Sequence, residues 1–502
     1  MVFISILLSF AISDSKQLYS TVQMMDQIMI LDTESLNIEQ SVMTEFGDTD
    51  NSVDCMSYSN QMQCDMTSGC EWSDMGMGMC MENTSSIDCM SYSTQMECNM
   101  NSGCEWSMMG MGMCMEGMSS NTVNTPHYIV LDEINGYWFV TTIASGFVAQ
   151  YSLVNNTLID AYFVGDAPAL LAVDPENKKI YCSRMMPMNG MGNMMPSSES
   201  NIIQGLNYNS MGMSESANQT YIINSPAPHG LAINDDGTEL YTVSNTADWL
   251  YKINTINHEI TGVVMDEQIG NTPDQVTQRL KPIQCISVGN RLFVSCSSGT
   301  WQDPYSGVQT VIQGSLQMWD SDTMTLLDDI DLGEHTAPWH IKESPVDNVV
   351  YVALSGDNLY ETEGLACVRY NEELAVDWIT NDSSFNILHG VDVSSDGSKI
   401  FVSARGDGYI HVFNSNGDYV ENVLLGSMSM LGGLAVEQMG NPELGDLNND
   451  LNINVVDIVS CISIIFNSMM NSPYSIYASD LNSDGMTNIF DVILIVEKIL
   501  QR

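Results

Sequence analysis

The sequence predicts a mainly β fold made of repeated four-stranded units, and three observations lead to it. The middle of the chain repeats at intervals of roughly 35 to 60 residues. Each repeat holds four short runs rich in apolar and β-branched residues, separated by turn residues, as in 226–264. Most repeats open on an apolar run that follows a proline. Units of this kind at this spacing are typical of a β-propeller.

The repeats account for six complete blades and one incomplete blade. The complete blades begin at His127, Ala169, His229, near Cys285, at His340 and at His389. A lone inner strand, "GGLAVEQ" at 432–438, remains without partners. Residues 17–42 align with three strands of a blade, so we expect segment 14–43 to complete the seventh. This three-plus-one velcro closure removes an open sheet edge and predicts a seven-bladed propeller over 127–440.

The blade pattern resembles that of a known family. Segments such as "PAPHGLAINDDGTELYTV" and "LHGVDVSSDGSKIFVSARGDGYIHVF" are similar to the blades of YVTN-repeat propellers. The resemblance covers most of residues 127–437. It implies a secreted seven-bladed propeller and names no specific activity.

The chain begins with the apolar run "MVFISILLSFAIS", which ends in a small-x-small pattern although no Lys or Arg precedes it. We interpret residues 1–13 as a signal peptide; the alternative is a β-strand. No other segment reaches the roughly 18 apolar residues of a transmembrane helix, so we expect no transmembrane anchor. Thirteen cysteines fit an oxidising compartment, which places the protein outside the cell or on its surface.

The charge balance excludes one class of partner. Lys and Arg number 14 against 63 Asp and Glu, which gives a formal net charge of −49. Such a surface repels nucleic acid phosphates and anionic membranes. We therefore expect no nucleic acid partner, and a surface that attracts cations.

An insertion at 44–126 contains two copies of one cysteine-rich repeat, at 54–82 and 88–116. So short a segment cannot bury enough core, which indicates a small module with two disulfides and leaves three pairings open. With Trp72 and Trp106, each copy resembles plexin–semaphorin–integrin modules. The copies are either spacers or, through their Met–Gly alternation, soft ligands for Cu(I). The eight cysteines are Cys55, Cys64, Cys70, Cys80, Cys89, Cys98, Cys104 and Cys114.

Two loops near the C-terminus carry the spacing of calcium ligands. Oxygen ligands at positions 1, 3, 5, 7, 9 and 12 of a loop wrap one Ca²⁺, and an apolar helix follows each loop. The predicted ligands are Asp446, Asn448, Asp450, Asn452, Asn454 and Asp457, then Asp480, Asn482, Asp484, Met486, Asn488 and Asp491, with the backbone carbonyl acting at position 7.

The pair of loops resembles a type I dockerin domain over 445–502. The resemblance implies a small α-helical, EF-hand-like domain with two calcium ions and a cohesin-like or other surface partner. Two departures stand out. Leu451 replaces the position-6 glycine that eases the sharp turn. The residues at positions 10 and 11, Val455-Val456 and Ile489-Phe490, are apolar where cellulosomal dockerins usually carry small polar residues.

Histidines recur at the starts of the predicted inner strands. Alignment on the proline places His127, His229 and His389 in one register, with His340 offset by one residue and His335 in the loop before it. We expect them around one mouth of the channel, on the face that also carries the loop 184–196. Imidazole and thioether suit copper, so a copper site is one interpretation; histidines that only bond neighbouring loops are the other. The methionines of this loop are Met185, Met186, Met188, Met191, Met194 and Met195.

These observations favour a secreted or cell-surface binding or scaffold propeller without catalytic activity, attached through its calcium module. Its ligand is an unknown protein or glycan at the propeller face. One alternative is a copper-dependent oxidoreductase or copper-handling protein with its site at the channel mouth. A second is a component of polysaccharide degradation, suggested by the dockerin resemblance alone.

Overall fold

The computed structural model describes most of the chain outside the inserted segment. It covers residues 16–44, 70–73, 79–82, 104–107, 113–116, 124–165, 167–184, 201–214, 219–266, 272–303, 305–357, 360–427, 429–440, 443–466 and 471–501. The chain divides into two compact units, one made of Met1–Thr44 with Asn124–Arg502 and the other of Glu45–Val123. In the described residues, no helix is long and apolar enough to cross a membrane.

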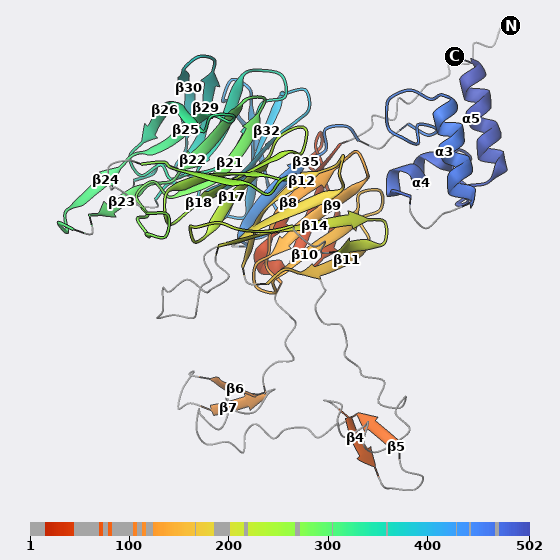
Figure 1. Cartoon of the computed structure of the whole chain (residues 1–502), viewed down its shortest axis with the longest axis horizontal. Coiled ribbons are helices and arrows are strands. Elements are labelled where there is room, and N and C mark those ends of the chain that lie inside the picture. Colours follow the sequence, from red (N-terminus) through yellow and green to blue (C-terminus); the bar gives the residue numbers. More distant parts are fainter. Residues whose placement is uncertain are drawn as a thin grey trace, which may run out of the picture. The chain divides into compact units, whose positions relative to one another are not determined.

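The first unit is a seven-bladed β-propeller, as predicted, with a small helical domain after it (Figure 1). Its strands pair antiparallel within each blade. Blade 1 contains β8 (Pro126–Asp132), β9 (Tyr137–Thr142), β10 (Phe147–Ser152) and β11 (Leu158–Phe163). Blade 2 contains β12 (Pro168–Asp174), β13 (Lys179–Arg184), β14 (Ile202–Asn209), β15 (Gly212–Ser214) and β16 (Thr220–Ile222). Blade 3 contains β17 (Pro228–Ile233), β18 (Glu239–Ser244), β19 (Trp249–Asn254) and β20 (Ile260–Val264).

The next three blades follow the same order from inner to outer strand. Blade 4 contains β21 (Pro282–Val288), β22 (Arg291–Cys296), β25 (Gly314–Asp320) and β26 (Thr325–Gly333), with the separate hairpin β23 (Gly299–Gln302) and β24 (Gln309–Ile312) between β22 and β25. Blade 5 contains β27 (Pro338–Glu343), β28 (Val349–Leu354), β29 (Gly364–Tyr370) and β30 (Leu374–Asn381). Blade 6 contains β31 (Leu388–Val393), β32 (Lys399–Ala404), β33 (Tyr409–Asn414) and β34 (Tyr419–Leu424).

Blade 7 combines strands from distant parts of the sequence. Its order is β3 (Ile38–Met43), β2 (Gln27–Asp32), β1 (Gln17–Val22) and β35 (Leu431–Val436). A 3-10 turn, η1 (Gln23–Met25), joins β1 to β2. Each inner strand packs against that of the next blade, and β35 packs against β8, so the ring of inner strands is closed.

Every inner strand begins with the same backbone feature. The residue before each one lies in the left-handed region: Thr125, Ala167, Ala227, Lys281, Ala337, Ile387 and Met430. In each blade the pairing between the inner strand and its neighbour shifts register within the next few residues. A β-bulge of this kind re-aims side chains locally. At the second and third residues of each inner strand, the side chains therefore do not alternate regularly between the two faces of the sheet.

A hydroxyl group on the second strand ties five blades to the next one. The hydroxyl donates to the backbone carbonyl of the second inner-strand residue of the following blade, in the pairs Thr21 to His127, Thr141 to Ala169, Ser183 to His229, Ser295 to Trp339 and Ser403 to Gly432. In four blades the same hydroxyl accepts from a backbone N–H of its own inner strand, at Tyr128, Leu170, Gln284 and Gly390. These bonds satisfy the polar groups that the bulges release. They also fix the segments that carry the channel histidines.

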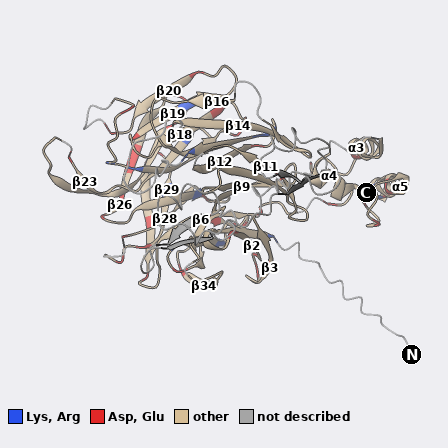
Figure 2. Ribbon diagram, turned by 90° about the horizontal axis from the view of Figure 1, so that it is seen from below, with Lys and Arg blue, Asp and Glu red and all other residues tan. Residues whose placement is uncertain are grey.

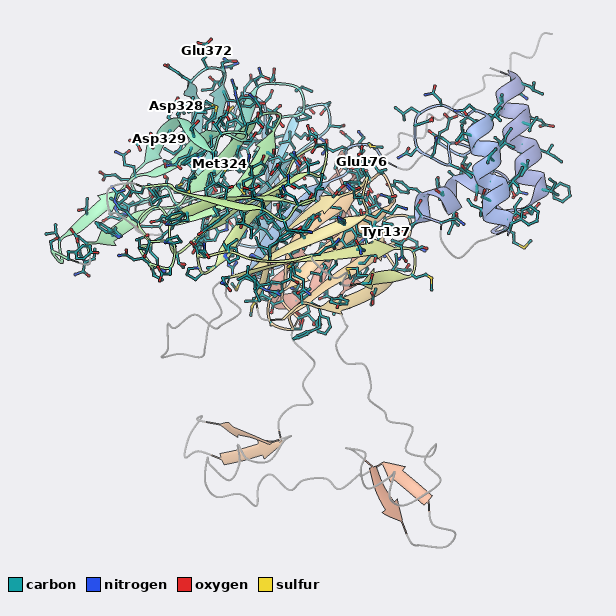
Figure 3. All side chains as sticks on the ribbon, viewed as in Figure 1. Tyr137, Glu176, Met324, Asp328, Asp329 and Glu372 are labelled. Carbon is teal, nitrogen blue, oxygen red and sulfur yellow. The ribbon has the colours of Figure 1, made fainter. Side chains whose placement is uncertain are left out.

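Several acidic side chains lie on the outer strands of blades 4 and 5. Figure 2 shows Asp and Glu scattered over the described surface with few Lys and Arg among them. Asp328 and Asp329 lie on β26 and Glu372 lies just before β30, on the outer side of blades 4 and 5 (Figure 3). Partial burial, with Asp331 and Asp328 nearby, raises the pKa of Asp329. The outer strands therefore hold a concentration of negative charge.

The second unit contains two hairpins of identical register. Strand β4 (Cys70–Ser73) pairs with β5 (Met79–Glu82), and β6 (Cys104–Ser107) pairs with β7 (Met113–Glu116). Trp72 lies opposite Cys80, and Trp106 lies opposite Cys114. The disulfides predicted for the eight cysteines of the repeats lie outside the described residues and side chains.

The C-terminal domain has three helices. They are α3 (Val455–Phe466), α4 (Pro473–Ser479) and α5 (Ile489–Gln501). The Ser472 hydroxyl accepts from the backbone N–H of Ser475, and Pro473 occupies the first turn, both of which favour the start of α4. A small core that includes Ile453, Cys461 and Ile495 joins the helices to the loops before them.

Candidate functional site

Four histidines converge inside the propeller channel. His127, His229 and His389 are the second residues of β8, β17 and β31, and His340 is the third residue of β27. We call these four residues the histidine layer. Their exposed fractions are 1%, 5%, 1% and 2% for His127, His229, His389 and His340. The sequence alignment therefore placed these residues on the correct strands, and the bulges bring the offset His340 in with the others.

The rings of three of these histidines are in contact. The ring centres of His340 and His389 are 4.6 Å apart, and those of His127 and His389 are 5.7 Å apart. Both pairs meet edge to face, with interplanar angles of 74° and 73°. Trp339 packs beside His389, and Tyr128 packs edge-on to His340 at 5.3 Å. His389 therefore lies at the centre of the layer.

Two of the histidines are anchored through one ring nitrogen. The Nδ1 of His127 is 2.8 Å from the side-chain amide nitrogen of Gln23. The Nδ1 of His229 donates to the backbone carbonyl of Ile283, at 2.7 Å. The remaining nitrogens differ: Nε2 of His127, Nε2 of His340 and both ring nitrogens of His389 are buried without a hydrogen-bond partner. An unsatisfied buried polar atom costs roughly 1–3 kcal/mol, so four of them in one place make the layer a candidate for binding a ligand or water.

Burial keeps these rings neutral. It lowers the pKa of His127 and His389 well below the usual value, and that of His340 to about 3. Neighbouring histidines and the Arg405 guanidinium lower these pKa values further. Burial also lowers the pKa of His229, although its bond to Ile283 opposes the shift. A neutral imidazole keeps one lone pair, which is the form that ligates metals.

Two glycines allow blade 7 to pack closely against the strand that carries His127. Inner strand β35 lies between β31 and β8 in the ring and presents Gly432 and Gly433 at the level of the histidines. A Cβ on Gly432 would lie 2.5 Å from the Thr21 hydroxyl and 2.6 Å from the His127 carbonyl oxygen. The missing side chain leaves room for the Thr21 hydroxyl and for the His127 backbone, which blade 7 packs against.

The other three histidines lie elsewhere. His335 lies in the loop before β27, where its Nδ1 is 2.9 Å from the Asp357 carboxylate and its ring stacks on Tyr360. A nearby acid and an aromatic ring therefore hold it in its own loop. His411 contacts Asp407 and Tyr419 in blade 6, and His258 lies exposed in a turn of blade 3. The methionines from Met185 to Met195 that we expected beside the layer lie outside the described residues.

Next to the layer, the channel contains a cavity of about 310 Å³. The Gln284 amide donates to the Tyr128 hydroxyl and accepts from the Ile341 backbone N–H, at 2.9 and 2.7 Å. Lys342 and Asp392 form an ion pair of 2.8 Å along the wall. Burial would lower the pKa of Lys342, but the Asp392 carboxylate outweighs it and raises that pKa. The cavity therefore offers polar groups of both charges.

Sequence reasoning missed the residues that complete this site. No local motif marks these residues. They are Gln23 in the turn after β1, Tyr128 in β8, Gln284 in β21 and Lys342 in β27. One signal was available. Tyr128 and Gln284 stand at the same inner-strand position as His340, so the offset histidine marks a position that faces the channel.

The two predicted calcium loops share one hydrogen-bond frame. The Asp446 carboxylate accepts from the backbone N–H of Asp450 and Leu451, as Asp480 does from Asp484 and Gly485. The last acid of each loop, Asp457 or Asp491, accepts from two further backbone N–H groups. Asp457 and Asp491 are fully buried. Each loop is thus folded around its own carboxylates.

The backbone of the two loops also agrees. The residues at positions 4 and 6 have positive φ in both: Asn449 (54°) and Leu451 (64°), then Ser483 (56°) and Gly485 (82°). Burial raises the pKa of Asp446, and the neighbouring Asp457 and Asp450 carboxylates add to this. A bound cation would offset that repulsion. The donor set of carboxylate and amide oxygens therefore fits Ca²⁺.

Neither the histidine layer nor the two predicted calcium loops have their side chains arranged as in a metal-bound site. Among the described residues, no three His, Cys, Asp or Glu side chains are grouped so that they could hold a metal ion as they stand. Binding at either site would therefore require side chains to turn toward the ion.

The described cysteines are free thiols in the core. Cys182, Cys285, Cys296, Cys367 and Cys461 are all buried and unpaired. Cys285 lies opposite Val294 and Cys296 lies opposite Pro282, so these two cysteines of blade 4 are out of register for a disulfide with each other. Burial raises the pKa of the Cys182 thiol to about 11, which makes it a poor nucleophile.

Comparisons with known proteins give propeller likenesses and no family. No protein-family model matches the chain, and no curated protein matches it. Hydrazine synthase of Kuenenia stuttgartiensis is 13% identical with a TM-score of 0.47, over 63% of this chain and 96% of that one. The dihydro-heme d1 dehydrogenase NirN is 9% identical with a TM-score of 0.46, over 85% and 76%.

A further likeness is the virginiamycin B lyase of Staphylococcus aureus, 12% identical with a TM-score of 0.44, over 62% of this chain and 92% of that one. With identities below 25% and TM-scores below 0.5, none of these likenesses carries information about activity. The seven sheets of the chain itself establish the propeller.

Proposed function

We propose that the protein is a non-catalytic binding propeller that works outside the cell or on its surface, with a dockerin-like module shaped by two calcium ions. The observation that carries the calcium part is the frame shared by the two loops, with the same hydrogen bonds and the same positive φ at positions 4 and 6. In this proposal the propeller is of the YVTN type. Its N-terminal strands β1–β3 close the ring on β35, as the pairing of β1 with β35 supports.

Calcium would be held by the side chains that the sequence singles out. Asp446, Asn448, Asp450, Asn454 and Asp457 would bind the first ion, with the Asn452 carbonyl. Asp480, Asn482, Asp484, Asn488 and Asp491 would bind the second, with the Met486 carbonyl. When bound, the ions neutralise repulsion between the carboxylates and fix the loops that position α3 and α5. The result is a rigid end domain.

The helices that follow the loops suit attachment to a partner. Val455 and Val456 are 65% and 54% exposed, and Ile489 and Phe490 are 60% and 65% exposed. These apolar residues stand at the starts of α3 and α5, directly after the calcium loops. Exposed apolar groups of this kind support an interaction surface whose shape depends on the ions. We propose that this surface attaches the propeller to a cohesin-like or other surface protein.

Calcium binding to the full chain tests the main proposal. We expect two Ca²⁺ per chain by isothermal titration calorimetry in the presence of excess Mg²⁺. Asp446→Asn and Asp480→Asn should each remove one of the two. Glu372→Gln, which changes an acid on the propeller, should leave both. Absence of calcium uptake at millimolar concentration, or uptake unaffected by either loop variant, would contradict the proposal.

A second candidate function is favoured by the histidine layer. Four unpartnered nitrogens on neutral, buried imidazoles support a copper-handling protein or a copper-dependent oxidoreductase with its site in the channel. His127, His229, His340 and His389 are its proposed residues, with the methionines of the loop at 184–196 as further candidates. Metal analysis of the purified full chain distinguishes the two candidates. The second candidate predicts bound copper, whereas the first predicts calcium alone.

A further inference from the structure

We propose that the C-terminal domain is docked on blade 1 of its own propeller, and that this docking and calcium binding in the first loop (446–457) strengthen each other. The second loop (480–491) takes no part in this coupling. The inference rests on the calcium binding proposed above and deepens it, because it gives the two ions different roles. The first ion would help to hold the domain on the propeller, and the second would stabilise the domain alone.

The docking surface on the propeller is the turn between β8 and β9. Its Asp132 carboxylate accepts from the backbone N–H groups of Ile134 and Asn135. The same carboxylate accepts from the Tyr208 hydroxyl of blade 2, at 2.6 Å. Gly136 closes the turn, with its N–H donating to the Asp132 carbonyl. Bonds within the turn and to the next blade therefore hold it in one conformation independently of the domain.

Tyr474 of α4 packs on this turn. It is 2% exposed, although it does not belong to the apolar core of the C-terminal domain. A Cβ on Gly136 would lie 2.7 Å from the Tyr474 ring and 2.9 Å from its backbone nitrogen, so the glycine leaves the room that α4 occupies. Burial raises the pKa of the Tyr474 hydroxyl, and the nearby carboxylates of Glu437, Glu133 and Asp132 raise it further. The propeller thus supplies the burial of this tyrosine.

Asn449 makes a second contact, and it belongs to the first calcium loop itself. Its side-chain amide donates to the Glu133 backbone carbonyl, at 3.2 Å. Asn449 occupies position 4 of the first loop, with φ of 54°. The residue at position 4 of the second loop is Ser483, which lines a cleft of about 600 Å³ between blade 1 and the domain. The two loops therefore meet the propeller differently.

The segment that leads from the propeller to the domain is held at the same place. The Glu133 carboxylate accepts from the backbone N–H groups of Gln438, Met439 and Gly440, at 2.8, 2.7 and 3.3 Å. These three residues follow β35. Glu133 thus binds the connecting segment through its carboxylate and the first calcium loop through its carbonyl.

Inside the domain, hydrogen bonds link the first loop to α4. The Ser475 hydroxyl, next to Tyr474, donates to the Leu447 carbonyl at 2.8 Å. The Leu447 N–H donates to the carboxylate of Asp457, a proposed calcium ligand, at 2.8 Å. An ion bound by the first loop would therefore order both contacts to the propeller, through Asn449 directly and through α4. Because a coupling between two equilibria is reciprocal, docking must raise the calcium affinity of this loop by the same factor.

Docking leaves the proposed attachment surface free. The four apolar residues at the starts of α3 and α5 are at least 54% exposed with the domain on the propeller; they are Val455, Val456, Ile489 and Phe490. An outside partner bound there would therefore hold the propeller in a fixed orientation.

Calcium titration calorimetry of the full chain carrying Asp480→Asn, in which the first loop alone binds, tests the coupling. We expect Glu133→Gln and Tyr474→Ala each to weaken this site by about tenfold. Tyr474→Phe keeps the buried ring, and Tyr477→Ala removes a ring of the same helix that is 36% exposed, so both should match the background protein. With Asp446→Asn as the background, the second loop should bind calcium equally in all of these variants.

Hydrogen exchange followed by mass spectrometry gives a second readout. In the Asp480→Asn protein, the amides of Met439 and Gly440 should exchange more slowly with calcium than with the chelator EGTA, because calcium stabilises the docked domain. In the same protein carrying Tyr474→Ala, calcium should not change their exchange.

The outcomes separate the inference from the function on which it rests. Equal affinity of the first loop in the background protein, in Glu133→Gln and in Tyr474→Ala would overturn the coupling and leave calcium binding in place. Weakening of both loops to the same extent by Tyr474→Ala would also refute it, since the tyrosine would then only stabilise the domain. Absence of calcium binding in the wild type would remove the proposed function together with the inference.

Discussion

The histidine layer and the calcium loops are two candidate metal sites built in opposite ways. Each calcium loop takes all its ligands from twelve consecutive positions and shapes itself with its own backbone hydrogen bonds, as Asp446 and Asp457 do in the first loop. The histidine layer takes its side chains from four blades, and no two of them are neighbours in sequence. The loops offer hard oxygen ligands, and the layer offers imidazole nitrogens in the core of the propeller. A local site survives changes elsewhere, whereas a distributed one depends on the whole ring.

The strongest test of this difference is Gly432→Ala. A Cβ there would lie 2.5 Å from the Thr21 hydroxyl and 2.6 Å from the His127 carbonyl oxygen. We expect a loss of about 3 kcal/mol in the free energy of unfolding, measured by urea denaturation, because the surrounding backbone cannot move away. Copper binding should fall with it and calcium binding should not. Gly440→Ala, where a Cβ meets nothing, should cost only about 1 kcal/mol of left-handed strain.

The hydroxyl connectors give a second way to separate the two sites. Ser403 accepts from the Gly390 backbone N–H at 2.8 Å and donates to the Gly432 carbonyl at 2.6 Å. Ser403→Ala leaves both groups buried without a partner, so we expect a loss of about 2 kcal/mol in thermal or urea unfolding. Ser398→Ala, which removes an exposed turn hydroxyl of the same blade, is the control. Equal stability of the two variants would show that the connectors are not important to the ring.

The difference between a site within one loop and a site built from several blades also explains how much of each could be predicted from the sequence. The candidate calcium ligands could be named one by one, because the spacing within one loop is enough to single them out. For the layer, the proline-anchored repeats placed His127, His229 and His389 on their strands, and the seven blades are confirmed. Gln23 and Gly432 could not be predicted as its partners, because they act through contacts between blades that no repeat period encodes. The contact of His335 with Asp357 could not be predicted either, because it joins two loops of blade 5 that no repeat pattern relates.

One buried acid at the end of the propeller, Glu437, should make the free energy of unfolding depend on pH. Glu437, directly after β35, has a pKa raised to about 7, first by burial and also by Glu133 and Glu39, although the bonds from Gln17 and Tyr19 oppose the shift. A carboxyl with a raised pKa in the folded state stabilises the fold when protonated. Its contribution is present below the ordinary carboxyl pKa and is lost as the pH rises toward 7.

Glu437→Gln should therefore be the more stable protein at pH 8, by about 2 kcal/mol, and the advantage should vanish near pH 4. The amide oxygen can still accept one of the two hydrogen bonds. Urea unfolding of both proteins across this pH range measures the effect. Glu421→Gln, on the exposed outer strand β34, is the control for replacing a glutamate by its amide. A constant difference at all pH values would mean that Glu437 does not titrate in this range.

The smallest predicted effect compares the two calcium loops with each other. Leu451 and Gly485 occupy position 6 of their loops, with φ of 64° and 82°. A left-handed conformation costs a leucine about 1 kcal/mol more than a glycine. Leu451→Gly should therefore tighten calcium binding in the first loop by about fivefold, and Gly485→Ala should weaken it in the second by a similar factor. Calorimetry of each variant, with the other loop disabled by Asp480→Asn or Asp446→Asn, isolates the two sites. Because Leu451 is 81% exposed, its replacement removes little packing, so a tighter first site would be the result of relieved backbone strain.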